Sequence, residues 1–323
     1  MNWGTFKDPR TWLVAGALLA TLIALIVPQI SLTRSTYDVL AVLDITTSMN
    51  TRDVATGGRP ESRLESAKAA LRTLLARLPC QSRLGLGIFT ERRTFLLFDP
   101  VEVCENFAAI DEAIAQIEWR MAWEGDSYVA KGLYSAIDIA KSLNADLIFI
   151  TDGHELPPLP YSGLPPFTEK PGDVGGLIVG IGGHTLAPLL KYDDEGREIG
   201  TFAEQEVPQE NRSGPPPPDA ASRPGYHPKW APFGTAVAHN NEHLAYVREA
   251  YLKQLAGVAG LHYAYLGNHQ ELLRPLVAAA HARPVEVATD ISAVPASLAL
   301  LLLAALYGLG LVSALRPAKL NPA

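Results

Sequence analysis

Apolar and polar residues alternate along this chain in blocks that predict strands and helices in turn. Residues 37–44, YDVLAVLD, form a short apolar run, which is typical of a strand buried on both faces. Residues 61–78, ESRLESAKAALRTLLARL, place alanine and leucine on one face at helical spacing. RLGLGIFT follows, and the polar ERR separates it from TFLLF, which predicts a hairpin of two strands.

The alternation continues as far as residue 283. NFAAIDEAIAQI and SYVAKGLYSAIDIAKSL predict helices, and ADLIFITDG and GGLIVGIGG predict strands. NEHLAYVREAYLKQLAGVAG, LHYAYL and HQELLRPLVAAAHA then predict a helix, a strand and a helix. Strands that alternate with helices form a mostly parallel sheet with helices on both faces. We therefore predict a doubly wound α/β domain over residues 36–283, in which the hairpin adds one antiparallel edge strand.

One segment, residues 184–241, breaks this alternation. It contains KYDDEGREIG, the prolines 215–218 and further proline and glycine, a composition that disfavours a packed core. We predict an irregular insertion that leaves the end of the GGLIVGIGG strand. KYDDEGREIG does not fit a calcium-binding EF-hand, because Gly196 at the sixth position puts Lys191 at the first and Phe202 at the twelfth. An acidic turn is the better interpretation.

Two apolar segments flank the domain, and each is close to the length that crosses a bilayer. Residues 11–32 and 294–315 show no polar face, which argues against buried core helices. The first segment is long for a cleavable signal peptide and is followed by no convincing small-x-small site, so we interpret it as a retained anchor. Basic residues lie outside both segments, at Lys7, Arg10, Arg316 and Lys319. The positive-inside rule places residues 1–10 and 316–323 in the cytoplasm and predicts a bacterial inner-membrane protein with a periplasmic domain.

Charge and cysteine content narrow the function. The chain has a formal net charge of −7, an isoelectric point near 5.6 and no basic stripe, which argues against nucleic-acid binding. Cys80 lies just before the second predicted strand and Cys104 just after the antiparallel third, so both lie at the same end of the sheet. Outside the cytoplasm such a pair is a disulfide candidate, and two buried free thiols are the alternative.

Oxygen-bearing side chains lie at three predicted junctions on one edge of the sheet. These junctions are Asp44-x-Thr46-x-Ser48, Gly125-Asp126-Ser127 and Thr151-Asp152-Gly153. Ligands of open α/β sheets bind outside the carboxyl ends of the strands, and hard divalent cations prefer oxygen ligands. The sequence therefore predicts a site for Mg²⁺, or another hard cation such as Mn²⁺ or Ca²⁺, with one coordination position open to a partner. Three hydroxyls and two aspartates from these junctions suit such an ion. For the first motif alone, an N-cap cluster is the alternative.

The sequence contains no recognisable catalytic motif. GDSYV is not the G-x-S-x-G elbow of hydrolases, no Walker A sequence occurs, and VGIGG lacks the full dinucleotide fingerprint. We therefore predict a binding module and not an enzyme. Aromatic and charged residues beside the metal loops would suit a partner-binding rim, with core packing as the alternative for the tryptophans. The predicted rim consists of Trp119, Arg120, Trp123, Asp126 and His154. For His154, an ordinary loop residue is the alternative.

Residues 37–283 resemble the von Willebrand factor A (VWA) domain, whose metal-ion-dependent adhesion site (MIDAS) uses a D-x-S-x-S loop, a later Thr and a later Asp. The matching residues are Asp44, Thr46, Ser48, Ser127 and Asp152. Thr46 and Ser127 each exchange one hydroxyl residue for the other, and Asp126 stands where glycine is common. The resemblance implies that the two ligand aspartates act mainly through coordinated waters and that the three hydroxyls bind the ion directly. It also implies a protein partner that offers a carboxylate to the ion.

A narrower resemblance covers longer stretches of the chain. DITTSMNTRD, LPCQSRLGLGIFTE, FDPVEVC and IEWRMAWEGDSYVAKGLYSA are similar to the MxaL family, the membrane VWA proteins encoded with bacterial methanol dehydrogenase. This resemblance implies an accessory role in assembly and calcium insertion of that periplasmic quinoprotein, together with a MoxR-type ATPase and other VWA proteins. A general VWA scaffold for envelope assembly or stress, unrelated to methanol oxidation, is the alternative.

Overall fold

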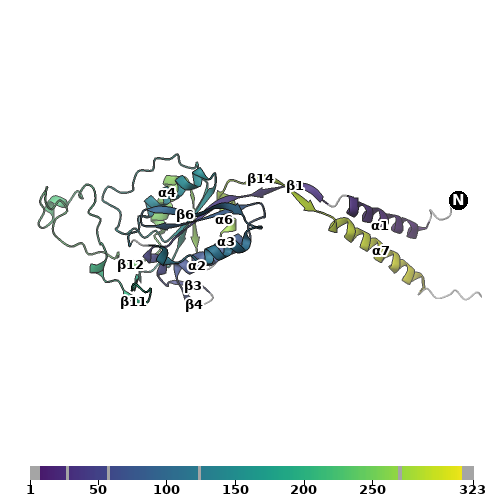
Figure 1. Ribbon diagram of the computed structural model, residues 1–323, viewed down its shortest axis with the longest axis horizontal. Helices are drawn as coiled ribbons and strands as arrows, with labels where there is room; N and C mark the ends of the chain where they lie inside the picture. The colour runs from purple at the N-terminus through teal and green to yellow at the C-terminus, as the bar shows by residue number, and fades with distance from the viewer. Residues whose placement is uncertain (1–7, 27–28, 57–58, 123–124, 268–270, 315–323) are drawn as a thin grey trace, which may run out of the picture. The chain divides into compact units, whose positions relative to one another are not determined.

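The computed structural model describes residues 8–26, 29–56, 59–122, 125–267 and 271–314 (Figure 1). The chain divides into two compact units. One unit consists of Met1–Arg34 together with Pro284–Ala323, and the other is Ser35–Arg283.

The larger unit is built on one central sheet. Its strands are β2 (Asp38–Asp44), β5 (Arg83–Thr90), β6 (Arg93–Glu102), β7 (Asp146–Thr151), β8 (Gly176–Ile181) and β13 (His262–Leu266). They lie in the order β13-β8-β7-β2-β5-β6, and all neighbours are parallel except β5 and β6. The structure thus confirms the predicted α/β fold with a mostly parallel sheet and one antiparallel edge strand. β2, β7 and β8 are buried along their whole length, as their apolar runs predict.

Helices cover both faces of this sheet (Figure 1). They are α2 (Arg63–Leu75), α3 (Phe107–Ala115), α4 (Val129–Ser142), α5 (Glu249–Ala259) and α6 (Leu273–Ala279). On one face α2, α3 and α6 bury side chains that include Leu71, Ile110 and Leu276. On the other face α4 and α5 bury side chains that include Leu133 and Leu252. The two apolar layers cover the faces of the sheet but not the ends of its strands, where a ligand could bind.

The strand order reverses at β2, which lies between β5 and β7. In an open α/β sheet, such a reversal creates a crevice outside the carboxyl ends of the strands. Asp44 ends β2 and Thr151 ends β7. Ser127, just before α4, reaches the same edge, because it forms an isolated bridge with Leu156 after β7. The three oxygen-bearing junctions of the sequence therefore converge there.

The insertion predicted over residues 184–241 consists of short elements joined by loops. They are β9 (Ala187–Pro188), β10 (Leu190–Tyr192), β11 (Glu198–Thr201), and the 3-10 turns η4 (Glu204–Glu206) and η5 (Ala220–Ser222). β10 and β11 pair antiparallel around the acidic turn, where Gly196 has φ +81°. The helix predicted to begin near Asn241 begins only at Glu249, because β12 (Leu244–Ala245) pairs with β9 instead. Short elements also lie beside the strand ends: η2 (Thr47–Asn50), β3 (Val54–Thr56), β4 (Arg59–Glu61) and η3 (Trp119–Met121).

The smaller unit corrects one predicted boundary. The first apolar helix, α1 (Pro9–Ile26), ends before residue 32. Gln29–Thr36 form a strand, β1, that pairs with β14 (Arg283–Asp290). The reason is local, since QISLTRST is rich in residues that favour strands. The second apolar helix, α7, spans Ala293–Ala314.

Small residues let α1 and α7 pack closely. A Cβ at Gly16 would lie only 3.2 Å from Cδ1 of Leu302, and Ala17, Ala20 and Ala299 are buried. Leucines on the remaining surface of both helices are exposed, as at Leu25 (77%). Among the described residues, α1 alone is both long enough and apolar enough to cross a membrane. In α7 the apolar stretch that is described, Ala293–Leu309, is shorter.

Candidate metal centre

Asp44 is the centre of a hydrogen-bond network at the end of β2. Its carboxylate is fully buried. One oxygen, Oδ1, accepts hydrogen bonds from the backbone N–H of Thr46 (2.9 Å) and from its hydroxyl (2.7 Å). The other, Oδ2, accepts from the hydroxyl of Thr151 on the neighbouring strand (2.6 Å). The network fixes the side chain of Asp44 at the edge formed by the carboxyl ends of the strands. Thr151 belongs to this network but not to the predicted ligand set.

The electrostatics of Asp44 favour a cation nearby. Burial, and then the negative charge of Asp152, raise the pKa of Asp44 to about 7, although hydrogen bonds from Thr151 and Thr46 oppose the rise. A carboxyl with this pKa is partly protonated at neutral pH. A divalent cation would supply the missing positive charge and stabilise the ionised form.

Two predicted ligands are buried hydroxyls without a hydrogen-bond partner among the described residues. Ser48 is 4% exposed and Ser127 is 3% exposed, and the Oγ atoms of both are orphaned. The backbone holds Ser127 in place, because its N–H donates to the carbonyl of Leu156 (2.6 Å) and its carbonyl accepts from the N–H of Leu156 (2.7 Å). Buried polar atoms are rarely left unpaired. A hard cation would satisfy both hydroxyls, so these residues fit the predicted ion.

Asp152, the last predicted ligand, is held by an arginine that the sequence interpretation missed. Its Oδ1 accepts the N–H of His154 (2.9 Å), and its Oδ2 accepts from Nη1 of Arg63. The side chains of Arg63 and Asp152 are both fully buried. The only sequence signal for Arg63 is its position, since it begins α2 on the face that continues with Ala67 and Leu71.

Arg63 also binds a second aspartate. Its Nε and Nη2 donate to the two carboxylate oxygens of Asp53, at 2.9 and 2.5 Å, in a fork-to-fork pair. The guanidinium lies against the glycines that end VGIGG: a Cβ at Gly182 (φ +120°) would lie 2.6 Å from Nε of Arg63. The N–H of Gly183 donates to Asp53 (2.9 Å). Gly182 and Gly183 therefore accommodate the guanidinium of Arg63 and its partner Asp53, and they do not form a dinucleotide-binding loop.

The chain's own insertion lies against part of the predicted rim. The ring of Trp119 stacks on Tyr192 of β10 with centroids 4.7 Å apart. Arg120 is exposed, and its Cδ lies 3.3 Å from where a Cβ of Gly196 would be. Arg52, beside the metal loop, pairs with Glu198 of β11 (2.9 Å). The β10–β11 hairpin therefore packs on the face that the prediction assigned to a partner.

The other rim residues differ in their placement. Asp126 is half-buried and, with Thr47, lines a cleft of about 220 Å³ closed on the other side by Phe202 and Glu206 of the insertion. His154 is 1% exposed, so its assignment to an exposed rim is wrong. Its ring Nε2 lies 3.3 Å from a carboxylate oxygen of Glu242, which is itself mostly buried. Trp123 lies outside the described residues.

Glu155 has a structural role that the sequence did not indicate. It is 3% exposed and accepts hydrogen bonds from the backbone N–H of Ala130 (2.8 Å) and from the hydroxyl of Tyr251. It thereby satisfies the first turn of α4 and joins α4 to α5. Burial raises the pKa of Glu155 to about 7, against the opposing effects of these hydrogen bonds and of Arg248.

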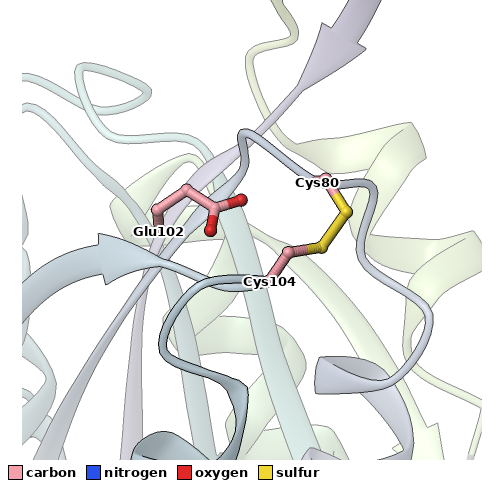
Figure 2. A group of neighbouring side chains, drawn as sticks. All are labelled: Cys80, Glu102 and Cys104. Carbon is pink, nitrogen blue, oxygen red and sulfur yellow. A yellow bond between two sulfur atoms is a disulfide. The ribbon is translucent and has the colours of Figure 1, made fainter. Parts of the chain in front are cut away.

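The structure joins Cys80 and Cys104 in a disulfide with a Cα–Cα distance of 5.3 Å (Figure 2). Glu102 lies beside this disulfide and accepts the backbone N–H groups of Gln81 and Glu105, both at 2.6 Å. The two sulfurs and this carboxylate are close enough to hold a metal, but sulfurs bonded to each other are not thiolates. This group therefore stabilises the two chain segments and is not a second metal site.

Comparison with known proteins identifies the central segment. Residues 39–154 match the sequence profile of the von Willebrand factor type A domain. This segment is a VWA domain. The profile covers β2 to β7 and all five predicted ligands, and the rest of the sheet completes the fold around it. No curated protein matches the chain.

Two solved structures are similar to this chain at low identity. One is an aerotolerance-related membrane protein from Bacteroides fragilis NCTC 9343, at 15% identity and a TM-score of 0.45, covering 75% of this chain and 97% of that one. The other is BatB from Bacteroides thetaiotaomicron, at 16% identity and a TM-score of 0.44, covering 74% of this chain and 94% of that one.

Proposed function

We propose that the VWA domain is a non-catalytic binding module that captures an acidic protein partner through a hard divalent cation, with Mg²⁺ as the first candidate. The ion would be held by Asp44, Thr46, Ser48, Ser127 and Asp152. The observation that carries this proposal is the pair of buried, orphaned hydroxyls, Ser48 and Ser127, at the edge where Asp44 and Asp152 also lie. A bound cation supplies an electrophilic position for a carboxylate. The chain's own residues would position that ion.

The two apolar helices support a membrane location for this module. Their exposed leucines would be costly in water and favourable in hydrocarbon. We propose that α1 and α7 both span the bacterial inner membrane, with both termini in the cytoplasm and the VWA domain in the periplasm. The Cys80–Cys104 disulfide agrees with that oxidising compartment.

The finer proposal is a role in methanol dehydrogenase assembly, together with a MoxR-type ATPase. Its support is the sequence similarity to the MxaL family over four stretches, two of which contain metal-loop residues. A general VWA scaffold in envelope assembly or stress is the second candidate, because the profile that residues 39–154 match is that of the VWA domain in general. The identity of the captured partner separates the two.

The test is Ser127→Ala in the full-length protein, solubilised from membranes in mild detergent. Because the Ser127 hydroxyl has no hydrogen-bond partner within the described ranges, its removal should leave the thermal stability in chelator unchanged. Mn²⁺ binding measured by calorimetry should weaken by about tenfold or more with the loss of one direct ligand. Ser142→Ala, at the exposed end of the helix that follows Ser127, is the matched control.

Capture from native membranes completes the test. The wild-type protein and the Ser142→Ala variant should retain partners in Mg²⁺ and release them in EDTA, whereas Ser127→Ala should capture little in either. Recovery of methanol dehydrogenase subunits would support the finer role, and recovery of other envelope proteins would support the scaffold. Equal capture by all three proteins in EDTA would refute the metal-dependent mechanism.

A further inference from the structure

We propose that Arg63 is the charge-setting residue of the metal site: it weakens the affinity for the cation and so keeps the loaded site neutral enough to accept an acidic partner. This inference rests on the proposed function and adds a residue that the predicted ligand set does not contain. It is carried by one geometric fact, which is that a single buried guanidinium bridges a proposed metal ligand, Asp152, and a second carboxylate, Asp53.

The placement of Arg63 is built into the fold. The hydroxyl of Ser62 accepts the N–H of Glu65 (3.2 Å) and so fixes the start of α2 at Arg63. The side chain then crosses to the carboxyl edge of the sheet, where it lies against Gly182 at the end of β8. Its Nη1 also approaches the carbonyl of Ser48, at 3.5 Å. A fully buried arginine is costly unless it is paired, and here every partner belongs to the metal loop or its surroundings.

A purely structural arginine would not need the contact with Asp152. The fork-to-fork pair with Asp53 already matches the geometry of a guanidinium. Nη1 reaches beyond that pair to the fully buried Asp152, and no other cationic side chain pairs with Asp152 in the described part of the chain. In the absence of a cation, Arg63 therefore neutralises Asp152 and holds it in place.

Charge determines what this contact does when a cation is present. Asp44, Asp53 and Asp152, when ionised, together with Arg63 leave two net negative charges, which one divalent cation cancels. Without Arg63, the loaded site would remain negative and would repel a carboxylate. With it, the cation is bound less tightly but the open position is compatible with an acidic partner.

The test measures Mn²⁺ binding by calorimetry, without any partner, in full-length protein in detergent. Arg63→Gln removes the positive charge and should tighten Mn²⁺ binding by about tenfold or more. Asp53→Asn removes a negative charge outside the ligand set and should weaken it by about the same factor. Arg63→Lys keeps the charge but loses the fork-to-fork geometry, so its Mn²⁺ affinity should lie between those of wild type and Arg63→Gln. Arg72→Gln is the control. Arg72 lies on the same helix as Arg63 and forms an exposed pair with Asp111 of α3, so its replacement should not change Mn²⁺ binding.

Thermal unfolding gives a second readout. Arg63→Gln should unfold at a much lower temperature in EDTA than in Mn²⁺, with a larger difference than wild type, because the cation then replaces the guanidinium beside Asp152. If Arg63→Gln does not fold, Asp53→Asn tests the proposal alone: weaker Mn²⁺ binding than wild type supports the role of Arg63. Arg63→Gln binding no tighter than wild type, or Asp53→Asn binding no weaker, would overturn the role of Arg63 alone. Failure of the wild type and both variants to bind Mn²⁺ would overturn the metal site itself.

Discussion

The hydroxyl of Thr151 donates a 2.6 Å hydrogen bond to Asp44 across two neighbouring strands. The same hydroxyl accepts the N–H of Gly153 (3.0 Å), so Thr151 connects the metal loop after β2 to the turn after β7. Thr151→Val removes the hydroxyl and leaves a buried carboxylate oxygen of Asp44 without a donor. We expect it to destabilise the domain by about 1–3 kcal/mol, measured by urea denaturation in EDTA.

Thr151→Ser is the matched control for that change. It keeps the hydroxyl and loses only a methyl group, so its unfolding free energy should lie between wild type and Thr151→Val. The effect of valine should also be smaller below pH 7, because a neutral, protonated Asp44 costs less to leave without that donor than a buried carboxylate does. A Thr151→Val protein as stable as wild type at every pH would contradict this role.

The strand ends of the site were accessible from sequence because they depend on local pattern. The apolar run of β2 and the TDG turn after β7 place Asp44 and Asp152 at strand ends, and parallel strands bring such ends to one edge. Ser127 followed from its position just before a predicted amphipathic helix. Each of these predictions needed only a short window of sequence and the rule for parallel sheets.

The contacts that surround these ligands were not accessible in the same way. Arg63 looks like an ordinary charged residue at a helix start, and its burial depends on Asp53 and on Gly182, which is far away in the sequence. Likewise, composition indicated an irregular insertion but not that Tyr192 would stack on Trp119. Pairings between distant segments depend on the assembled fold, which periodicity does not encode.

Glu155 predicts an unusual dependence of stability on pH. Its pKa is about 7 in the folded domain and near 4.5 when unfolded, so between these values only the folded form keeps the proton. The contribution of Glu155 to the free energy of unfolding is therefore fully present below pH 4.5. It decreases as the pH rises toward 7, by up to about 3 kcal/mol. Asp44, whose pKa is also about 7, acts in the same direction when no cation is present.

Thermal unfolding in EDTA between pH 5 and pH 8 measures this effect. The wild-type melting temperature should fall across that range, and Glu155→Gln should fall less, since glutamine still accepts from Ala130 and Tyr251 but does not ionise. Asp44→Asn should reduce the slope further in the double variant. A slope that Glu155→Gln leaves unchanged would show that Glu155 is not the titrating group.

The β10–β11 hairpin should loosen when its aromatic contact is removed. Tyr192→Ala eliminates the stacking on Trp119, an interaction that contributes about 0.5–1.5 kcal/mol beyond burial. We expect faster hydrogen exchange at the N–H of Phe202, which donates to the carbonyl of Leu189 (3.0 Å) at the base of the hairpin. Trp230→Ala, in the same insertion but 75% exposed, should leave that exchange rate unchanged. Protection of Phe202 that survives Tyr192→Ala would mean that other contacts hold the hairpin.

The disulfide and Glu102 should each stabilise the corner of the domain where the segments around Cys80 and Cys104 meet, and their contributions can be measured separately. Cys80 and Cys104 are 24 residues apart in sequence, and closing a loop of this length stabilises a fold by about 3 kcal/mol. The double serine variant should therefore lose about that much unfolding free energy in urea, and reductant should lower the wild type to a similar value.

Backbone N–H groups, above all that of Glu105, lower the pKa of Glu102 despite some burial, so Glu102 stays ionised. Glu102→Gln should weaken the corner with or without reductant, and an effect seen only in oxidised protein would mean that it acts through the disulfide.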